Sequence, residues 1–257
     1  MPTVAEFTFF TLILGRMAGI FSSIPLFGGK RVPMRIKAIT TLTMALVCYP
    51  ILRAGGIPPL PEDTVSLVLL VARETLIGIT LGMLGQVLFA AVEFCGQIVG
   101  MQMGLSIVSE FDPSQGNQAS VMSIFQGLLA LLLFVSLGVH HFFIRTIIES
   151  YTPVPIGAWH MTGGLMQYLI TLTGQIFVLA VKLAAPVMVA LLATSVALGI
   201  MARAFPQMNV FMVSMPLNIG IGFLVLGMSL TIFLHTLQGA FNGISQQIKV
   251  LLKLMGG

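Results

Sequence analysis

The sequence predicts an all-α membrane protein. The chain has 257 residues, of which 57% are hydrophobic and only 8% are charged, whereas soluble domains contain about 25% charged residues. Twelve lysines and arginines and eight acidic residues cannot form a polar shell around a protein of this size. Lipid or other proteins must therefore cover much of its surface. In lipid, an isolated segment satisfies its own backbone only as a helix, so we expect helices throughout.

Six apolar stretches are long enough for membrane helices, which need about 20 residues each. They cover residues 7–27, 38–57, 64–92, 119–144, 165–201 and 208–236. The fifth stretch is too long for one crossing and contains Lys182 and Pro186. We therefore expect it to be either one long kinked helix or the two halves of a hairpin.

The distribution of basic residues argues against six simple crossings. The densest basic group lies within residues 30–37, and the positive-inside rule places it on the cytoplasmic side. Six crossings would then put Lys249 and Lys253 on the opposite side, against the same rule. A plain six-span topology is therefore not expected.

The C-terminal tail has the periodicity of an amphipathic helix. Its apolar positions are Leu237, Phe241, Ile244, Ile248, Leu251 and Met255. The polar positions opposite them are Gln246, Gln247, Lys249 and Lys253. Such a helix lies at the membrane interface or docks on a partner, and the pattern favours neither.

Ionisable residues interrupt several of the apolar stretches. They are Arg16, Arg73, Glu74, Glu93 and Lys182. Intramembrane ionisable groups nearly always face protein or water, so we expect these side chains to be buried in protein. We expect the adjacent Arg73 and Glu74 to form hydrogen bonds within a complex. The alternative is a proton relay, in which Glu93 would also take part.

Glycines recur with helical spacing and predict faces on which helices pack closely. The spaced sets are Gly15 and Gly19, Gly78 and Gly82, and Gly96, Gly100 and Gly104. The run of three is the most informative, because single pairs are common in membrane helices.

A polar, turn-rich segment follows the last of these glycines. It begins with Leu105, Ser106, Ile107, Val108, Ser109, Glu110, Phe111, Asp112 and Pro113 and continues to Ala119. Asp112 and Pro113, followed by Gly116 and Asn117, are typical of turns. Irregular backbone at membrane depth is tolerated only where it lines or fills a cavity. The spacing alone is equally compatible with a channel plug and with an exposed connector.

Other classes of site find no support in the sequence. Cys48 and Cys95 lie in apolar stretches without CxxC spacing, and the adjacent His140 and His141 would point in different directions on a helix. No catalytic triad, GxGxxG or P-loop arrangement is evident. We therefore expect no cofactor, no metal and no enzymatic activity. Because the chain has no broad basic face, we also expect no nucleic-acid partner.

Several short motifs occur in a specific order along the chain. They are Arg16 with Gly19; Pro25 to Gly28 and Pro33; Arg73, Glu74, Gly78 and Gly82; Gly96 to Leu105; Asp112 and Pro113; Gly138, His140 and His141; Pro186; and Pro206 to Phe211. In these motifs the chain resembles the FliR/SctT family of the type III secretion export apparatus over nearly its whole length.

The resemblance implies an all-helical subunit of a hetero-oligomeric helical assembly in the bacterial inner membrane, at the flagellar basal body. Residues 1–257 would form one export-gate domain, with residues 1–180 similar to FliP. Residues 181–257 would be a FliQ-like hairpin with the amphipathic C-terminal helix. The implied partners are FliP, FliQ, FlhB, FlhA in the larger apparatus, unfolded flagellar export substrates and membrane lipid.

The resemblance also implies that Leu105 to Ala119 plug the export channel. Two alternatives remain open at this stage. One is an ion-coupled transporter with an intramembrane relay, although the inverted repeats common in such transporters are not evident. The other is a purely structural assembly scaffold.

Overall fold

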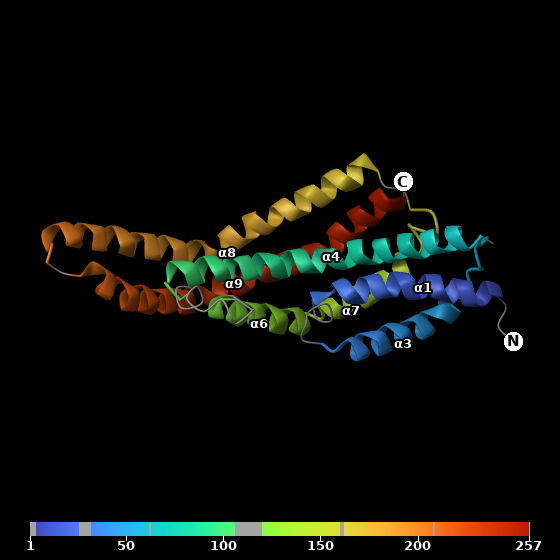
Figure 1. The fold of residues 1–257 in the computed structure, drawn as a ribbon, viewed down its shortest axis with the longest axis horizontal. Helices are drawn as coiled ribbons and strands as arrows, with labels where there is room; N and C mark the ends of the chain where they lie inside the picture. The colour runs from blue at the N-terminus through green and yellow to red at the C-terminus, as the bar shows by residue number, and fades with distance from the viewer. Residues whose placement is uncertain are drawn as a thin grey trace. The chain divides into compact units, whose positions relative to one another are not determined.

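A computed structural model of the chain describes residues 4–25, 32–61, 63–105, 120–159, 162–207 and 209–256. Within these ranges the protein consists of helices, with no β-strand (Figure 1). The helices are α1 (Val4–Ser23), α3 (Met34–Arg53), α4 (Thr64–Gln102), α6 (Val121–Ser136), α7 (Val139–Glu149), α8 (Gly163–Ala204) and α9 (Val210–Gly256). Five of them are long and apolar enough to cross a membrane, or six if α6 and α7 together form one span. The predicted all-α membrane class is confirmed.

The chain divides into two compact units. Unit 1 contains Met1–Val87, Gly138–Leu172 and Asn242–Gly257, and unit 2 contains Leu88–Leu137 and Thr173–Phe241. Each unit is therefore built from segments that are far apart in the sequence. The predicted division into a FliP-like part and a FliQ-like hairpin stays a prediction.

Two helix boundaries differ from the predicted stretches. The stretch 165–201 belongs to one continuous helix, α8, so the hairpin alternative is wrong. The stretch 119–144 is divided between α6 and α7 because Gly138 has a φ of 66°, a left-handed conformation that ends α6. Glycine adopts this conformation at little cost because it has no Cβ.

The outer helix of unit 1 is α3, which packs on α1. The ring of Tyr49 lies 6.0 Å from that of Phe9 and 5.9 Å from that of Phe10. Buried side chains on α3 are confined to Thr41, Ala45 and Cys48. The helix therefore presents most of its apolar surface outward.

The amphipathic C-terminal tail is the last part of α9. In unit 1 its apolar positions Ile244, Ile248, Leu251 and Met255 are buried within the chain. The Tyr168 hydroxyl of α8 donates to the carbonyl of Gln247 at 3.4 Å. The predicted apolar face is therefore covered by the chain itself, and neither the membrane interface nor a partner is needed to cover it.

Candidate functional site

A fully buried ion pair lies within unit 1. The Nε of Arg16, on α1, donates to Oε2 of Glu74, on α4, at 2.7 Å, and neither side chain is exposed. The two residues are 58 positions apart in the sequence. Because charges this deeply buried are costly unless they are paired and hydrogen-bonded, the remaining polar atoms of both groups also need partners.

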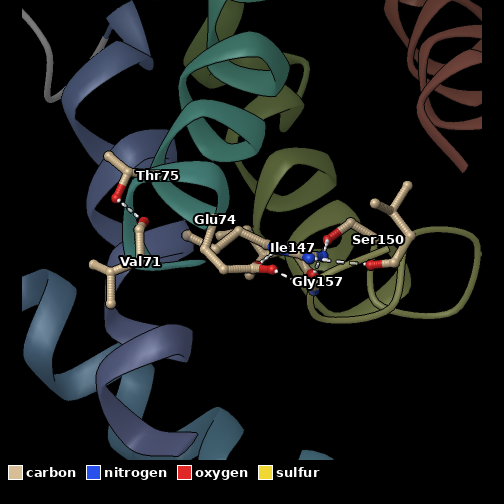
Figure 2. A network of polar contacts seen from close by, with 8 residues as sticks. Val71, Glu74, Thr75, Ile147, Ser150 and Gly157 are labelled. Carbon is tan, nitrogen blue, oxygen red and sulfur yellow. Dashed lines mark hydrogen bonds and ion pairs between the residues drawn. The ribbon is translucent and has the colours of Figure 1, made fainter. Parts of the chain in front are cut away.

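The segment that follows α7 supplies those partners. Arg16 donates through its two terminal nitrogens to Oγ of Ser150 at 3.2 Å and to the carbonyl of Val154 at 3.0 Å. The backbone amide of Gly157 donates to Oε1 of Glu74 at 3.2 Å. Figure 2 shows Glu74 directed towards Gly157 and Ser150. The network therefore ties α1, α4 and residues 150–157 together.

An aromatic ring completes the surroundings of the guanidinium. The Cζ of Arg16 lies 3.9 Å from the centre of the Tyr151 ring, a cation–π contact. Burial raises the pKa of the Tyr151 phenol above its ordinary value, so this side chain stays neutral beside the ion pair. Both carboxylate oxygens of Glu74 accept hydrogen bonds, which is typical of a structural ion pair that holds segments together.

Two glycines of α4, four residues apart, bring α1 and α4 into close backbone contact beside this network. A Cβ on Gly78 would meet the Arg16 carbonyl, and it would lie 2.9 Å from the amide nitrogen of Ile20. A Cβ on Gly82 would lie 2.5 Å from that of Ser23. These glycines therefore form a packing face between two helices of the same chain.

The structure corrects the expected pairing of Arg73 with Glu74. Glu74 pairs with Arg16, while Arg73 is exposed on the surface of the chain, because neighbouring positions on a helix point in different directions. Glu93 is also exposed, although its carbonyl accepts a hydrogen bond from Ser123 at 2.9 Å. The chain itself therefore buries Arg16 and Glu74 and leaves Arg73 and Glu93 for its surroundings to cover.

A second glycine face, in unit 2, joins the end of α4 to the start of α6. A Cβ on Gly96 would contact the Cα of Ser123 and lie 2.6 Å from its amide nitrogen. A Cβ on Gly100 would contact Oγ of Ser120. Ser120 is the N-cap of α6, and its Oγ accepts from the amide of Met122 at 3.3 Å. Gly100, near the end of α4, and Ser120, just before α6, are thus held in close contact.

Gly96→Ala is expected to destabilise the protein by about 1–3 kcal/mol, because the added methyl group meets backbone atoms that cannot move aside. The measurement is the denaturant-induced unfolding of the purified protein in detergent. Gly127→Ala on α6 is the matched control, since a Cβ there has no neighbour within 4 Å. Equal stability of the two variants would show that the Gly96 face is not closely packed.

Gly104 does not belong to the helical glycine ladder that its spacing predicts. It follows the end of α4 and has a φ of 79°. The amide of Leu105 donates to the carbonyl of Gly100 at 3.0 Å, and that of Gly104 donates to the carbonyl of Met101 at 3.0 Å. This is the Schellman arrangement of a helix C-terminus, so Gly104 ends α4 and turns the chain into the polar segment.

We expect Gly104→Ala to lower the free energy of unfolding by about 1–2 kcal/mol, the cost of a left-handed conformation for a residue with a Cβ. Gly104→Asn should cost less, because asparagine adopts this conformation more readily. Chemical denaturation of both variants and the parent in detergent tests the ranking. If alanine proves as stable as glycine, the cap does not depend on the left-handed conformation.

The predicted plug residues fall largely beyond the part of the chain that the structure describes. Leu105 is half-buried. The residues that lie outside the described ranges are Ser106, Ile107, Val108, Ser109, Glu110, Phe111, Asp112, Pro113 and those up to Ala119. Just before them, Met103 is buried, and its Cγ would lie 2.6 Å from a Cβ on Gly222 of α9. The described chain just before the segment is therefore packed within unit 2.

Sequence reasoning missed several residues of these two networks. The connecting segment that contains Ser150, Tyr151 and Gly157 has the prolines and glycine of an ordinary loop, so its sequence does not mark these residues. The sequence did indicate a packing role for Ser120 and Ser123, because small residues at this spacing on one helix can face glycines on another. Among the described residues, no cluster of three or more potential metal ligands occurs.

Comparison with known proteins connects these features to one family. Residues 7–244 match the family of bacterial export proteins, family 1. The chain is 30% identical over 253 residues to the flagellar biosynthetic protein FliR of Bacillus subtilis (strain 168), covering 97% of this chain and 96% of that protein.

Other FliR proteins give similar values. Identity is 32% over 215 residues with that of Pectobacterium carotovorum subsp. carotovorum, covering 84% of this chain and 81% of the relative. The chain is 30% identical over 207 residues to the FliR of Escherichia coli (strain K12), covering 80% of this chain and 78% of the relative. These relatives span most of the chain, as does the family match. The chain therefore belongs to family 1 of the bacterial export proteins.

Proposed function

We propose that the chain is a subunit of the flagellar type III export gate, where it helps to form and plug the channel for unfolded flagellar proteins. Its family and its FliR relatives make it a component of the flagellar export apparatus. Its long apolar helices make it a membrane protein. We further propose the bacterial inner membrane, at the flagellar basal body, as its location. In this role the chain acts as channel wall and plug and not as an enzyme.

The observation that carries the plug assignment is a contact between described residues on either side of the segment. Gly100 and Ser120 lie against each other, and Gly104 turns the chain out of α4. The described residues before and after 106–119 therefore lie close together within unit 2. Such a segment can be displaced by cargo without separating the helices that hold it, as a plug requires.

Exposed charges on α4 support burial in a larger assembly. Arg73 and Glu93 lie on a helix apolar enough to cross a membrane, and both are exposed on this chain. Ionisable side chains in such helices are rarely exposed to lipid. We propose that FliP, FliQ and FlhB, with FlhA in the larger apparatus, surround the chain and cover part of this surface.

Native mass spectrometry of the detergent-extracted complex tests this function. We expect the chain to co-purify with FliP and FliQ. Recovery only as a monomer or a homodimer would contradict the export-gate assignment and favour the transporter alternative. A complex that contains the partners but conducts no cargo would instead favour the assembly scaffold.

A further inference from the structure

We propose that unit 1 binds one diacyl lipid, with one acyl chain in each of two neighbouring apolar pockets. The first pocket, of about 510 Å³, and the second, of about 610 Å³, share the residues Ile57 and Pro58. All residues that line the two pockets belong to unit 1. We call this pair the double pocket. The proposal concerns a bound lipid molecule and stands whether or not the chain lines a channel.

The wall between the two pockets follows from the sequence after α3. Gly56 has a φ of 94°, a left-handed conformation that suits glycine, and its amide donates to the carbonyl of Arg53 at 2.9 Å. The chain then continues through Pro58, Pro59 and Pro61. Because proline has a restricted φ and no amide hydrogen, such a stretch stays extended without a neighbouring strand to pair with it. A narrow extended segment of this kind can separate two pockets.

Both pockets are lined mainly by apolar side chains, and none of the described lining residues carries a charge. Besides the shared wall, the first pocket is lined by Phe9, Ile51, Leu52, Ile148 and Ile156. The second is lined by Val4, Ala5, Leu60 and Leu67. Pockets for small ligands have volumes of about 300–1,000 Å³ and mostly apolar linings. The double pocket therefore suits apolar groups and not ionic ones.

Two pockets of similar volume on either side of one wall indicate the kind of ligand. A diacyl lipid has two acyl chains of similar size that are joined at one end, so the chains can pass on either side of the wall. A protein segment would fill both pockets only with two bulky side chains at the separation that the wall imposes. A monoacyl lipid would fill one pocket only. Because binding strengthens with each buried methylene group, the diacyl lipid is favoured.

A buried polar group in the first pocket suits the ester group of such a lipid. Tyr151 lines this pocket, and among the described residues its hydroxyl has no hydrogen-bond partner. A buried donor without a partner is costly, so a neutral acceptor beside it is stabilising. The ester carbonyl of a lipid is such an acceptor. Arg53, close in sequence to the wall, already pairs with Glu6, so we expect the acyl chains, and not the charge of the head group, to determine binding.

Native mass spectrometry of the full chain, purified alone in detergent, tests the site with two lipids of the same head group. The probes are dioleoylphosphatidylcholine and monooleoyl-lysophosphatidylcholine. We expect one diacyl molecule to remain bound to each chain. The monoacyl probe should bind at least about tenfold more weakly, since it buries one acyl chain in place of two. Equal binding of the two probes would overturn the proposal.

Filling one pocket gives a variant with a matched control on the same helix. Ala5 lines the second pocket, whereas Ala18 is exposed on the chain and lines neither. We expect Ala5→Phe to lower binding of the diacyl probe at least about tenfold, and Ala18→Phe to leave it unchanged. The midpoint of thermal unfolding establishes that both variants are folded. If Ala5→Phe retains the lipid as well as Ala18→Phe does, the double pocket does not hold it.

Tyr151→Phe tests the first pocket without filling it, because the variant keeps the aromatic ring beside Arg16. The loss of one neutral hydrogen bond should weaken binding of the diacyl probe about three- to tenfold. Unchanged binding would show that no ester group lies beside this hydroxyl.

A photoreactive phenylalanine analogue in place of Thr8, which lines the second pocket, identifies the occupant in the membrane-embedded complex. We expect its major adduct to be a phospholipid. An adduct mainly with another protein chain would assign the double pocket to a protein interface and overturn the proposal. That result would leave the co-purification test of the export-gate function unaffected.

Discussion

Glu74→Ala is expected to abolish most of the folded protein, because it leaves the Arg16 guanidinium fully buried without its counter-charge. Removing one member of a buried pair typically costs about 3–5 kcal/mol. The segment 150–157 would also lose the carboxylate that holds the Gly157 amide. The measurements are the yield of chain in the detergent-extracted complex and the midpoint of its thermal unfolding.

Two further variants make this expectation specific. Arg73→Gln, at the adjacent position that the chain itself leaves exposed, should leave the unfolding midpoint nearly unchanged when both variants are purified in detergent as the chain alone. The double variant Arg16→Met with Glu74→Leu should recover part of the loss, since apolar residues of similar volume often replace a buried ion pair at little cost. Recovery should be incomplete because Ser150, Val154 and Gly157 lose their partners. Equal behaviour of Glu74→Ala and Arg73→Gln would contradict a structural ion pair.

The relay alternative predicts a different result for Glu74→Gln. An amide keeps a hydrogen-bond acceptor for Arg16 but cannot exchange a proton as a carboxylate does. Normal assembly combined with a specific loss of proton-dependent export would therefore support a relay.

The positions of the apolar stretches were predictable from the sequence, because helix length and hydropathy are local properties. The pairing of Arg16 with Glu74 was not, since it depends on how α1 and α4 are rotated against each other. Sequence proximity suggested Arg73 as the partner, yet adjacent residues on a helix point apart. Gly19 and Gly78 lie where the two helices touch, but the spacing of glycines in the sequence does not indicate which helices pack together.

Gly104 shows a similar limit of spacing arguments. Its distance of four residues from Gly100 is compatible with a continuing helix and equally with a cap. The turn-rich composition immediately after it was the signal for the cap. The amphipathic tail likewise predicted a covered face without predicting what covers it, and residues of the same chain do so in unit 1.

Deleting Ser109 to Gln118 is expected to leave the complex assembled but permeable to ions and small solutes. The described contact next to the deletion, between Gly100 and Ser120, involves none of the deleted residues. Apolar side chains in a constriction exclude water and thereby block small ions as well as protein. Removing Phe111 and its neighbours should therefore open a conducting path while export of larger cargo persists. The measurement is ion conductance of liposomes that contain the purified complex.

Length-preserving variants separate loss of the apolar side chains from strain in a shortened connection. Serine at positions 107, 108 and 111 should reproduce the leak, because it keeps the chain length and removes the water-excluding groups. Serine or glycine at 115, 117 and 118 should leave the complex as tight as the parent. Native mass spectrometry of each sample establishes that partners are retained before conductance is compared. Assembled deletion complexes that stay as tight as the parent would make residues 106–119 a connector and remove the basis for a plug.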